Sequence, residues 1–474
     1  MQRYPRSVGY VFTTSRKLGT TCASVSKFNN ETNHTKTRKL GTTAAKNSAS
    51  NELIYTHIKE ALKFDASAFE QWPKHIILRN WSSFMICQFD FITRNSPKIM
   101  NLGNHRFNPL RPVFQFGMRH TVYSEFEILK FSTVSTNFCP FILNALNNQF
   151  VGGDTDKEIA ETCESLEKYG IEPMLAIPME TENIVAGQDI SLWHEVNLTK
   201  MLDSIRAAAK FAIKFKPAIH VKVTGIMHTE LFLKISDHIG LDIFESSSKQ
   251  KFEDCVQEFI NLMENPDLDT SSSYFSSFLS EKELKHLKTG AARVKLVGEK
   301  IAKEKTQVLI DAEYININPA ITVMTLALAR LYNTPETPYI WNTYQCYLKN
   351  TPKLVDYEIE YLTRHKVSWG AKIVRGAYMA SERTRAEQGG YPDPVCDDIQ
   401  ATHDNYNGVI TSLIERYGGG EKIQFLVASH NEETIKLAVD QLKEVEKSGK
   451  VVWDDVIFGQ LYREFENMVE IILE

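Results

Sequence analysis

The stretch QVLIDAEY (307–314) passes from a short apolar run to the acidic Asp311 within a few residues. Five other runs in the second half of the chain have a similar profile: IHVKVTG (219–225), YIWNTYQ (339–345), AKIVRGAY (371–378), FLVASHNE (425–432) and VIFGQL (456–461). Each run is rich in β-forming residues, is too short for a buried helix and alternates with helical stretches. This pattern is typical of parallel strands that helices cover on both faces. We therefore predict an α/β fold of the (β/α)8 barrel type.

Polar side chains stand at or near the carboxyl ends of these runs. They are Lys222, Asp311, Gln345, Lys372, Tyr378, His430 and Gln460. In a barrel of parallel strands all carboxyl ends lie on the same side, so residues at these ends converge on one mouth. The sequence therefore predicts an enzyme.

The strands and helices of the predicted barrel follow one another along the chain. The first strand is IEPMLAIPME (171–180), and the others begin near residues 219, 307, 339, 370, 424 and 456. Helical spacing of apolar residues covers 155–169, 198–215, 319–332, 353–366, 402–417 and 431–447. The sequence SEKE (280–283) indicates a capping box at the start of another helix.

No strand signal follows the seventh strand. After Leu461 the chain continues as YREFENMVEIILE (462–474). Closure of this barrel type needs one more strand. We therefore expect residues 151–474 to form a barrel that is truncated after about 461, with unpaired edges on its first and seventh strands.

The amino-terminal third of the chain has a different organisation. The first fifty residues hold nine Lys or Arg, fifteen Ser or Thr and one acidic residue, Glu31. This composition predicts a mitochondrial transit peptide over 1–50, and a disordered basic tail is the alternative. Residues 51–150 are predicted to form a helical arm, with an insertion at 126–149.

Composition excludes several other classes of protein. The formal net charge of −5, which becomes more negative if the basic first fifty residues are removed, argues against nucleic-acid binding. No window holds the roughly 18 apolar residues that a membrane span needs. The seven cysteines contain no CxxC pair, which favours reduced thiols, and the 13 histidines show no metal-binding spacing.

Several longer strings resemble the proline dehydrogenase family. They are WNTYQCYLK (341–349), GAKIVRGAYMASER (370–383) and VASHNEET (427–434), with DAEY (311–314), FGQL (458–461) and MRHTVY (118–123) alongside. The resemblance covers roughly 150–461. It implies an FAD-dependent flavoprotein that oxidises L-proline to 1-pyrroline-5-carboxylate and passes electrons to quinone. It also implies a position on the matrix side of the inner mitochondrial membrane, in peripheral contact with that membrane.

The resemblance also implies roles for individual residues. Asp311 and Lys372 match catalytic positions, and a cation such as Lys372 can stabilise a reduced, anionic flavin. Lys222 matches a contact to the substrate carboxylate. The positions that match cofactor-binding residues are Ala312, Gln345, Gly376, Ala377, Tyr378, Ser429 and His430.

Each of these residues also has a purely structural alternative. Asp311 then forms an ion pair with a neighbouring lysine, and Lys372 extends its charge from the strand into water. Gln345 is then a hydrogen-bonded surface amide at a strand end, and His430 a core histidine that bonds to the backbone.

The sequence departs from the family pattern at its carboxyl end. The family continues with a strand and a helix whose paired arginines bind the substrate carboxylate, and these arginines have no counterpart here. The alternative function is therefore an inactive truncated isoform that acts as a binding or interaction protein. Hydroxyproline also stays open as the substrate, because the missing segment shapes the ring pocket. Another flavin barrel, such as a folate reductase, resembles the chain in fold alone.

Overall fold

The computed structural model describes residues 10–15, 152–153, 155–168, 171–176, 190–212, 216–240, 246–265, 267–447 and 455–461. The predicted helical arm, its insertion and the end of the chain after Leu461 lie outside the described residues. The predicted transit peptide lies outside them as well, except for residues 10–15. Among the described helices, none combines the length and the apolar character that a membrane crossing requires.

Seven parallel strands form the sheet, and neighbours in the chain are neighbours in space. They are β2 (Ile171–Ala176), β3 (Ala218–Val221), β4 (Gln307–Ile310), β5 (Ile340–Gln345), β6 (Trp369–Val374), β7 (Ile423–Ala428) and β8 (Val456–Leu461). All residues of β3, β4 and β5 are buried. This burial explains the largely apolar sequences of β3 and β4, and the seven predicted strands are confirmed.

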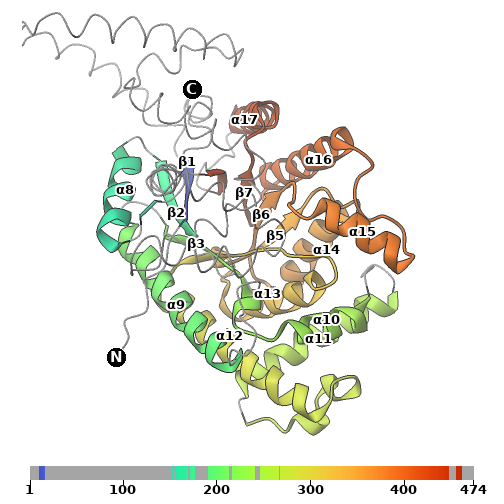
Figure 1. The fold of residues 1–474 in the computed structure, drawn as a ribbon. Helices are drawn as coiled ribbons and strands as arrows, with labels where there is room; N and C mark the ends of the chain where they lie inside the picture. The colour runs from blue at the N-terminus through green and yellow to red at the C-terminus, as the bar shows by residue number, and fades with distance from the viewer. Residues whose placement is uncertain are drawn as a thin grey trace, which may run out of the picture. The chain divides into compact units, whose positions relative to one another are not determined.

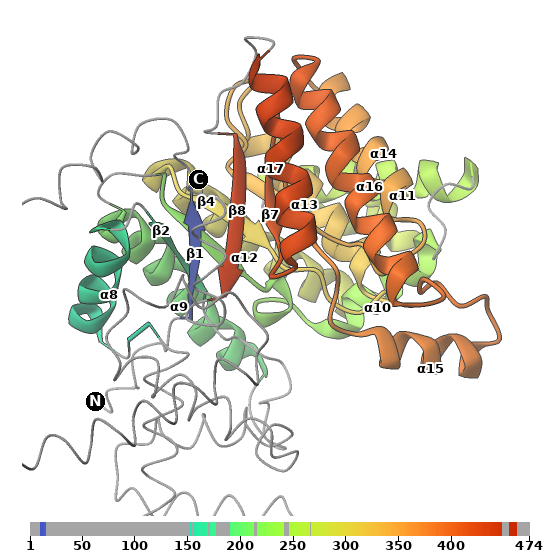
Figure 2. The ribbon, with the colours of Figure 1, turned by 90° about the horizontal axis from the view of Figure 1, so that it is seen from above.

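A further strand, β1 (Tyr10–Ser15), lies between β2 and β8 and closes the barrel. It runs antiparallel to both neighbours, with Tyr10 opposite Ala176 and Phe12 opposite Leu461. Figure 2 shows it between the two strands that we expected to have unpaired edges. That expectation is not met, because an extended segment can hydrogen-bond to a free strand edge in either direction.

Figure 1 shows that several helices lie around the sheet. The described part of the chain contains ten helices. They are α8 (Asp156–Lys168), α9 (Ile190–Phe211), α10 (Thr229–Ile239), α11 (Ser246–Glu264), α12 (Glu281–Glu304), α13 (Asn318–Tyr332), α14 (Thr351–Arg364), α15 (Met379–Gly389), α16 (Ile399–Gly418) and α17 (Glu432–Lys447), with short 3-10 turns η4 (Val223–Gly225), η5 (Thr270–Ser272) and η6 (Tyr274–Ser277). The predicted capping box of α12 is present: the backbone N–H of Ser280 donates to Glu283 Oε2 at 2.9 Å.

Inward-facing side chains fill the barrel in layers. The middle layer is apolar and consists of Met174, Ala218, Leu309, Trp341, Leu426 and Ile457. Below it, toward the amino ends of the strands, Gln307 Nε2 donates to Gln424 Oε1 at 3.0 Å. Side chains alternate between the two faces of a strand, so the next inward positions after Leu309 and Ala218 belong to Asp311 and His220. A polar upper layer thus lies directly above the apolar middle layer, at the carboxyl ends of the strands.

Candidate active site

Three side chains from different strands meet in the upper layer of the barrel. Lys372 of β6 places its Nζ 2.5 Å from Asp311 Oδ1, directly after β4. The same Nζ lies 3.0 Å from Nδ1 of His220 in β3. The His220 side chain is 3% exposed, the Lys372 side chain 11% and the Asp311 side chain 24%. The two predicted catalytic residues are therefore in direct contact, and a histidine that we did not predict joins them.

Charge governs the protonation of this cluster. Burial alone raises the pKa of Asp311, but the Lys372 ammonium beside it outweighs burial and holds that pKa well below its usual range. For His220, burial and the Lys372 charge together lower the pKa to about 4. Asp311 is therefore an anion and His220 a neutral ring at neutral pH. The ion pair that was the structural alternative for Asp311 exists, and its partner is the other predicted catalytic residue.

The chain after Asp311 connects the ends of three strands. Glu313 is buried and accepts a hydrogen bond from Thr224 Oγ1, at the end of β3, at 2.6 Å. Its backbone carbonyl accepts a hydrogen bond from Gln345 Nε2, the last residue of β5, at 2.9 Å. Burial raises the pKa of the Glu313 carboxyl. Ala312, between the two acids, is partly exposed. The Gln345 amide is thus hydrogen-bonded, but it is buried in the mouth and is not the surface amide of the structural alternative.

Lys222 follows β3 and precedes the short turn η4. Two buried side chains hold this turn: Asn197 Nδ2 donates to the Gly225 carbonyl at 3.0 Å, and Arg293 Nη1 donates to the Ile226 carbonyl at 3.3 Å. Burial raises the pKa of Tyr378, and the positive charge of Lys222 opposes this shift. Lys222 is therefore within electrostatic range of the loop that follows β6.

That loop, Gly376–Ala377–Tyr378, leads from β6 into α15. Gly376 has a φ of +129°, a conformation that side chains with a Cβ rarely adopt. A Cβ at this position would also lie 1.6 Å from Cδ1 of Tyr347. The glycine is thus required by its backbone conformation and by the Tyr347 ring. The Tyr378 ring lies 4.4 Å from the Tyr314 ring, between centroids.

Arg375, just before this loop, connects it to the end of β7. Its Nη1 donates to Ser429 Oγ at 2.7 Å, and its guanidinium lies 4.4 Å from the centre of the Tyr406 ring. The backbone N–H of Leu461, the last residue of β8, donates to His430 Nε2 at 3.3 Å. Ser429 and His430 therefore contact the neighbouring loop and strand, and His430 forms a backbone bond of the kind that its structural alternative described.

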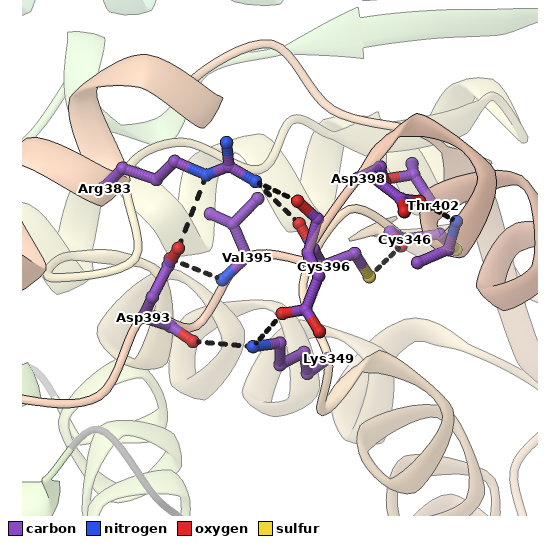
Figure 3. Close-up of polar contacts among 10 residues, drawn as sticks. Cys346, Lys349, Arg383, Asp393, Val395, Cys396, Asp398 and Thr402 are labelled. Carbon is purple, nitrogen blue, oxygen red and sulfur yellow. Dashed lines mark hydrogen bonds and ion pairs between the residues drawn. The ribbon is translucent and has the colours of Figure 1, made fainter.

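The loop between α15 and α16 forms hydrogen bonds and an ion pair with the residues that follow β5, and Figure 3 shows several of these contacts. The Cys396 N–H donates to the Tyr347 carbonyl at 2.8 Å, and Lys349 Nζ lies 2.9 Å from Asp397 Oδ1. Arg383 Nη2 donates to the Cys396 carbonyl at 2.7 Å. On its other side, the Tyr347 N–H donates to the Arg375 carbonyl at 2.7 Å. Tyr347 is thereby held against Gly376 from both sides.

Four residues of this mouth were missed at the level of sequence: His220, Glu313, Tyr347 and Arg375. A signal existed for His220, since it lies two positions before Lys222 and so shares its side of the strand. Arg375 and Tyr347 lie inside the strings RGAY and QCYLK, next to residues that we did select. For Glu313, the signal was a second acid two positions after Asp311, close to the end of an apolar strand.

The strand order brings the predicted cofactor-binding residues to one side of the mouth. β4, β5, β6 and β7 are successive neighbours in the sheet. Their carboxyl ends carry Ala312, Gln345, Gly376, Ala377, Tyr378, Ser429 and His430. Gly376 and Ala377 are exposed, while Lys372 lies deeper in the barrel. These four adjacent strand ends combine small, exposed loop residues with polar side chains. Such a surface can accommodate a flat cofactor that has a polar edge.

The chain is similar to several known proteins. A family model described as proline dehydrogenase matches residues 159–463. The hydroxyproline dehydrogenase of Xenopus laevis is 32% identical over 405 residues, which cover 85% of this chain and 77% of that relative. Human proline dehydrogenase 1, mitochondrial, is 37% identical over 187 residues, which cover 39% of this chain and 30% of that relative.

A solved structure shares the fold. It is the crystal structure of proline utilization A from Bdellovibrio bacteriovorus inactivated by N-propargylglycine, which aligns with a TM-score of 0.54 at 15% identity. The alignment covers 90% of this chain and 38% of that chain. At this identity the similarity concerns the fold alone, and this chain spans well under half of that protein's length.

Proposed function

Because the chain belongs to the proline dehydrogenase family, we propose that it catalyses the FAD-dependent oxidation of a cyclic imino acid, either L-proline or hydroxyproline. The observation that carries this proposal is the buried pair of Asp311 and Lys372, 2.5 Å apart at the carboxyl end of the barrel. During hydride transfer, positive charge develops on the donor and negative charge on the acceptor. A fixed anion and a fixed cation can stabilise these two charges.

The mouth supports FAD as the cofactor. The residues that we propose to hold it are Ala312, Gln345, Gly376, Ala377, Tyr378, Ser429 and His430, with Lys372 beneath them. Their fit rests on the four neighbouring strand ends and on the exposed backbone of Gly376 and Ala377. When bound, FAD supplies the acceptor for the hydride.

The reaction removes a hydride, which passes to the cofactor, from the ring carbon beside the nitrogen, and a proton, which passes to water, from that nitrogen, so that a C=N bond forms. For L-proline the product is 1-pyrroline-5-carboxylate. In our proposal Lys222 binds the substrate carboxylate, and Asp311 stabilises the positive charge that develops at the nitrogen. Its low pKa suits this role, since an acid that stays ionised is a better electrostatic partner than a proton acceptor. Lys372 stabilises the negative charge on the cofactor side.

We propose both L-proline and hydroxyproline because some relatives are described as hydroxyproline dehydrogenases and others as proline dehydrogenases. The Xenopus laevis relative, described as a hydroxyproline dehydrogenase, aligns with 85% of the chain, whereas the human proline dehydrogenase 1 aligns with 39% at higher identity. The ratio of kcat/KM for L-proline and trans-4-hydroxy-L-proline, measured on one preparation, decides which substrate is preferred.

The central experiment follows the flavin itself. The purified 474-residue chain, incubated with FAD and freed of excess, should be yellow, with an absorbance maximum near ~450 nm. Anaerobic addition of L-proline or hydroxyproline should bleach this band. A folded, yellow preparation that neither imino acid bleaches contradicts the proposed oxidation. A folded preparation that takes up no FAD contradicts the cofactor assignment.

We further propose that the protein is mitochondrial and passes its electrons to quinone. The basic, acid-poor first fifty residues support this location, and two of the relatives, from human and Arabidopsis thaliana, are described as mitochondrial. Because β1 (Tyr10–Ser15) of the barrel lies within these fifty residues, their removal after import would also remove this strand. Residues 1–50 fused to a fluorescent protein should reach mitochondria, and a cytosolic signal would contradict the location. Imino-acid-dependent reduction of a soluble quinone tests the acceptor.

A further inference from the structure

We infer that His220 is a positioning residue for the proposed reaction: its Nδ1 accepts a hydrogen bond from Lys372 and thereby fixes the ammonium group beside Asp311. The inference rests on the proposed function, because it concerns the same pair of charges. The resemblance in sequence assigned no role to His220, and neither does any of the comparisons.

The contacts that carry the inference come from three strands. Lys372 Nζ is 3.0 Å from His220 Nδ1 and 2.5 Å from Asp311 Oδ1, and His220 Nδ1 is 3.4 Å from the same carboxylate oxygen. His220 is 3% exposed, so bulk water does not compete for its Nδ1. The ring therefore occupies one of the few acceptor positions around a nearly buried ammonium.

The partner determines the tautomer of His220. An ammonium group can only donate, so the Nδ1 that it approaches must be unprotonated, and the ring proton lies on Nε2. Burial and the adjacent Lys372 charge lower the pKa of His220 to about 4, which agrees with a neutral ring. An unprotonated Nδ1 cannot donate to Asp311. The 3.4 Å approach to Asp311 is therefore not a hydrogen bond, and His220 Nδ1 accepts its hydrogen bond from Lys372.

This arrangement orients the remaining N–H of Lys372. Of the three N–H groups of a lysine, one donates to Asp311 and one to His220, and the third is left for the cofactor or the substrate. Without the His220 acceptor, Asp311 alone holds the ammonium, which can then rotate about a single hydrogen bond. A misplaced charge of this kind slows the chemical step more than it weakens substrate binding.

A matched pair of variants tests this role. His220→Asn keeps an acceptor, because the amide oxygen can take the place of Nδ1, whereas His220→Leu keeps the approximate volume and removes the acceptor. In the FAD-loaded protein at saturating imino acid, we expect His220→Leu to reduce the flavin roughly 10- to 100-fold more slowly, and His220→Asn to stay within about 3-fold of wild type. Equal losses in the two variants, or no loss in His220→Leu, would overturn the inference.

A second measurement does not depend on turnover. In protein with 15N-labelled histidine, the ring signal that disappears in His220→Asn identifies His220, and we expect the neutral tautomer with its proton on Nε2. Lys372→Met removes the facing positive charge and leaves Asp311, so the pKa of His220 should rise. A proton on Nδ1, or a titration that Lys372→Met does not change, would overturn the inference. If wild type reduces no flavin, the proposed function fails while these spectra still decide the contact.

Discussion

The pKa values of two carboxyl groups close to β5, those of Asp311 and Glu358, move in opposite directions. Asp311 lies in the barrel mouth beside Lys372 and has a pKa well below its usual range. Glu358 lies in α14, behind β5, and burial raises its pKa to about 7. Burial alone disfavours both anions. The difference therefore comes from the partners that each acid has.

The partners of Glu358 are neutral. Tyr344 Oη donates to Glu358 Oε2 at 2.5 Å, and Asn342 Nδ2 donates to the same oxygen at 3.1 Å. Trp369 Nε1 in turn donates to Tyr344 Oη at 2.9 Å. These donors lower the pKa of Glu358 but do not outweigh complete burial. Neutral hydrogen bonds satisfy the carboxylate without supplying the charge that keeps it ionised at neutral pH.

The alternation of β5 creates these two environments. Trp341 belongs to the apolar layer inside the barrel and Gln345 to the mouth, whereas Asn342 and Tyr344 contact α14 outside. One strand thus lines a charged site on one side and supports a neutral network on the other. We take the first as the reactive region and the second as part of the scaffold.

The largest expected effect is on the mouth. Asp311→Ala should leave FAD bound and slow flavin reduction by about 10²–10³-fold, because one charged partner of the transition state is lost. Single-turnover reduction by the preferred imino acid measures this. Glu358→Gln is the matched control, a buried carboxylate replaced outside the site, and should keep the wild-type rate. An unchanged rate in Asp311→Ala would show that Asp311 has only a structural role, and that it does not differ from Glu358 in function.

The next effect is the pH dependence of stability that Glu358 confers. Its pKa is about 7 in the folded protein against 4.5 for an unperturbed glutamate side chain, so the folded state binds the proton more tightly than the unfolded chain does. Its stabilising contribution is then complete below about pH 4.5 and is lost as the pH rises to about 7, by roughly 3 kcal/mol at most.

Urea midpoints between about pH 4.5 and 8 measure this contribution. Glu358→Gln should flatten that part of the profile, whereas Glu360→Gln, an exposed acid on the same helix, should leave it unchanged. An identical slope in wild type and Glu358→Gln would show that Glu358 is already ionised at low pH, as Asp311 is.

The smallest expected effect is the loss of stability on removal of the Tyr344 hydroxyl, which donates a hydrogen bond to Glu358. Tyr344→Phe removes one hydrogen bond to Glu358 and one acceptor of Trp369, which should cost about 1–3 kcal/mol in the free energy of unfolding. It should also raise the pKa of Glu358 further, since the hydroxyl lowers it. Thermal unfolding, compared with the half-exposed control Tyr332→Phe, measures the cost. Equal melting temperatures for the two variants would contradict a hydrogen-bonded network.

Much of the fold was predictable from local sequence. The run VLI in β4 is apolar because both faces of this strand are covered, and the Ser280–Glu283 pair indicates the start of α12. The mouth residues Asp311 and Lys372 were predictable because Asp311 directly follows β4 and Lys372 lies in the second half of β6. Their direct contact was not predictable, because the alternation of a strand gives the side on which a residue lies and not its partner.

The sequence by itself determined the order of strands and helices and the polar ends of the strands, since these depend on periodicities of a few residues. Only the tertiary structure decided which charges meet. Lys372 lies 61 positions from Asp311 and 152 from His220, and closure of the barrel brings them together. The same holds for β1, which pairs with β2 and β8 from the other end of the chain. Protonation and strand pairing depend on neighbours in space, and the distance along the chain does not specify those neighbours.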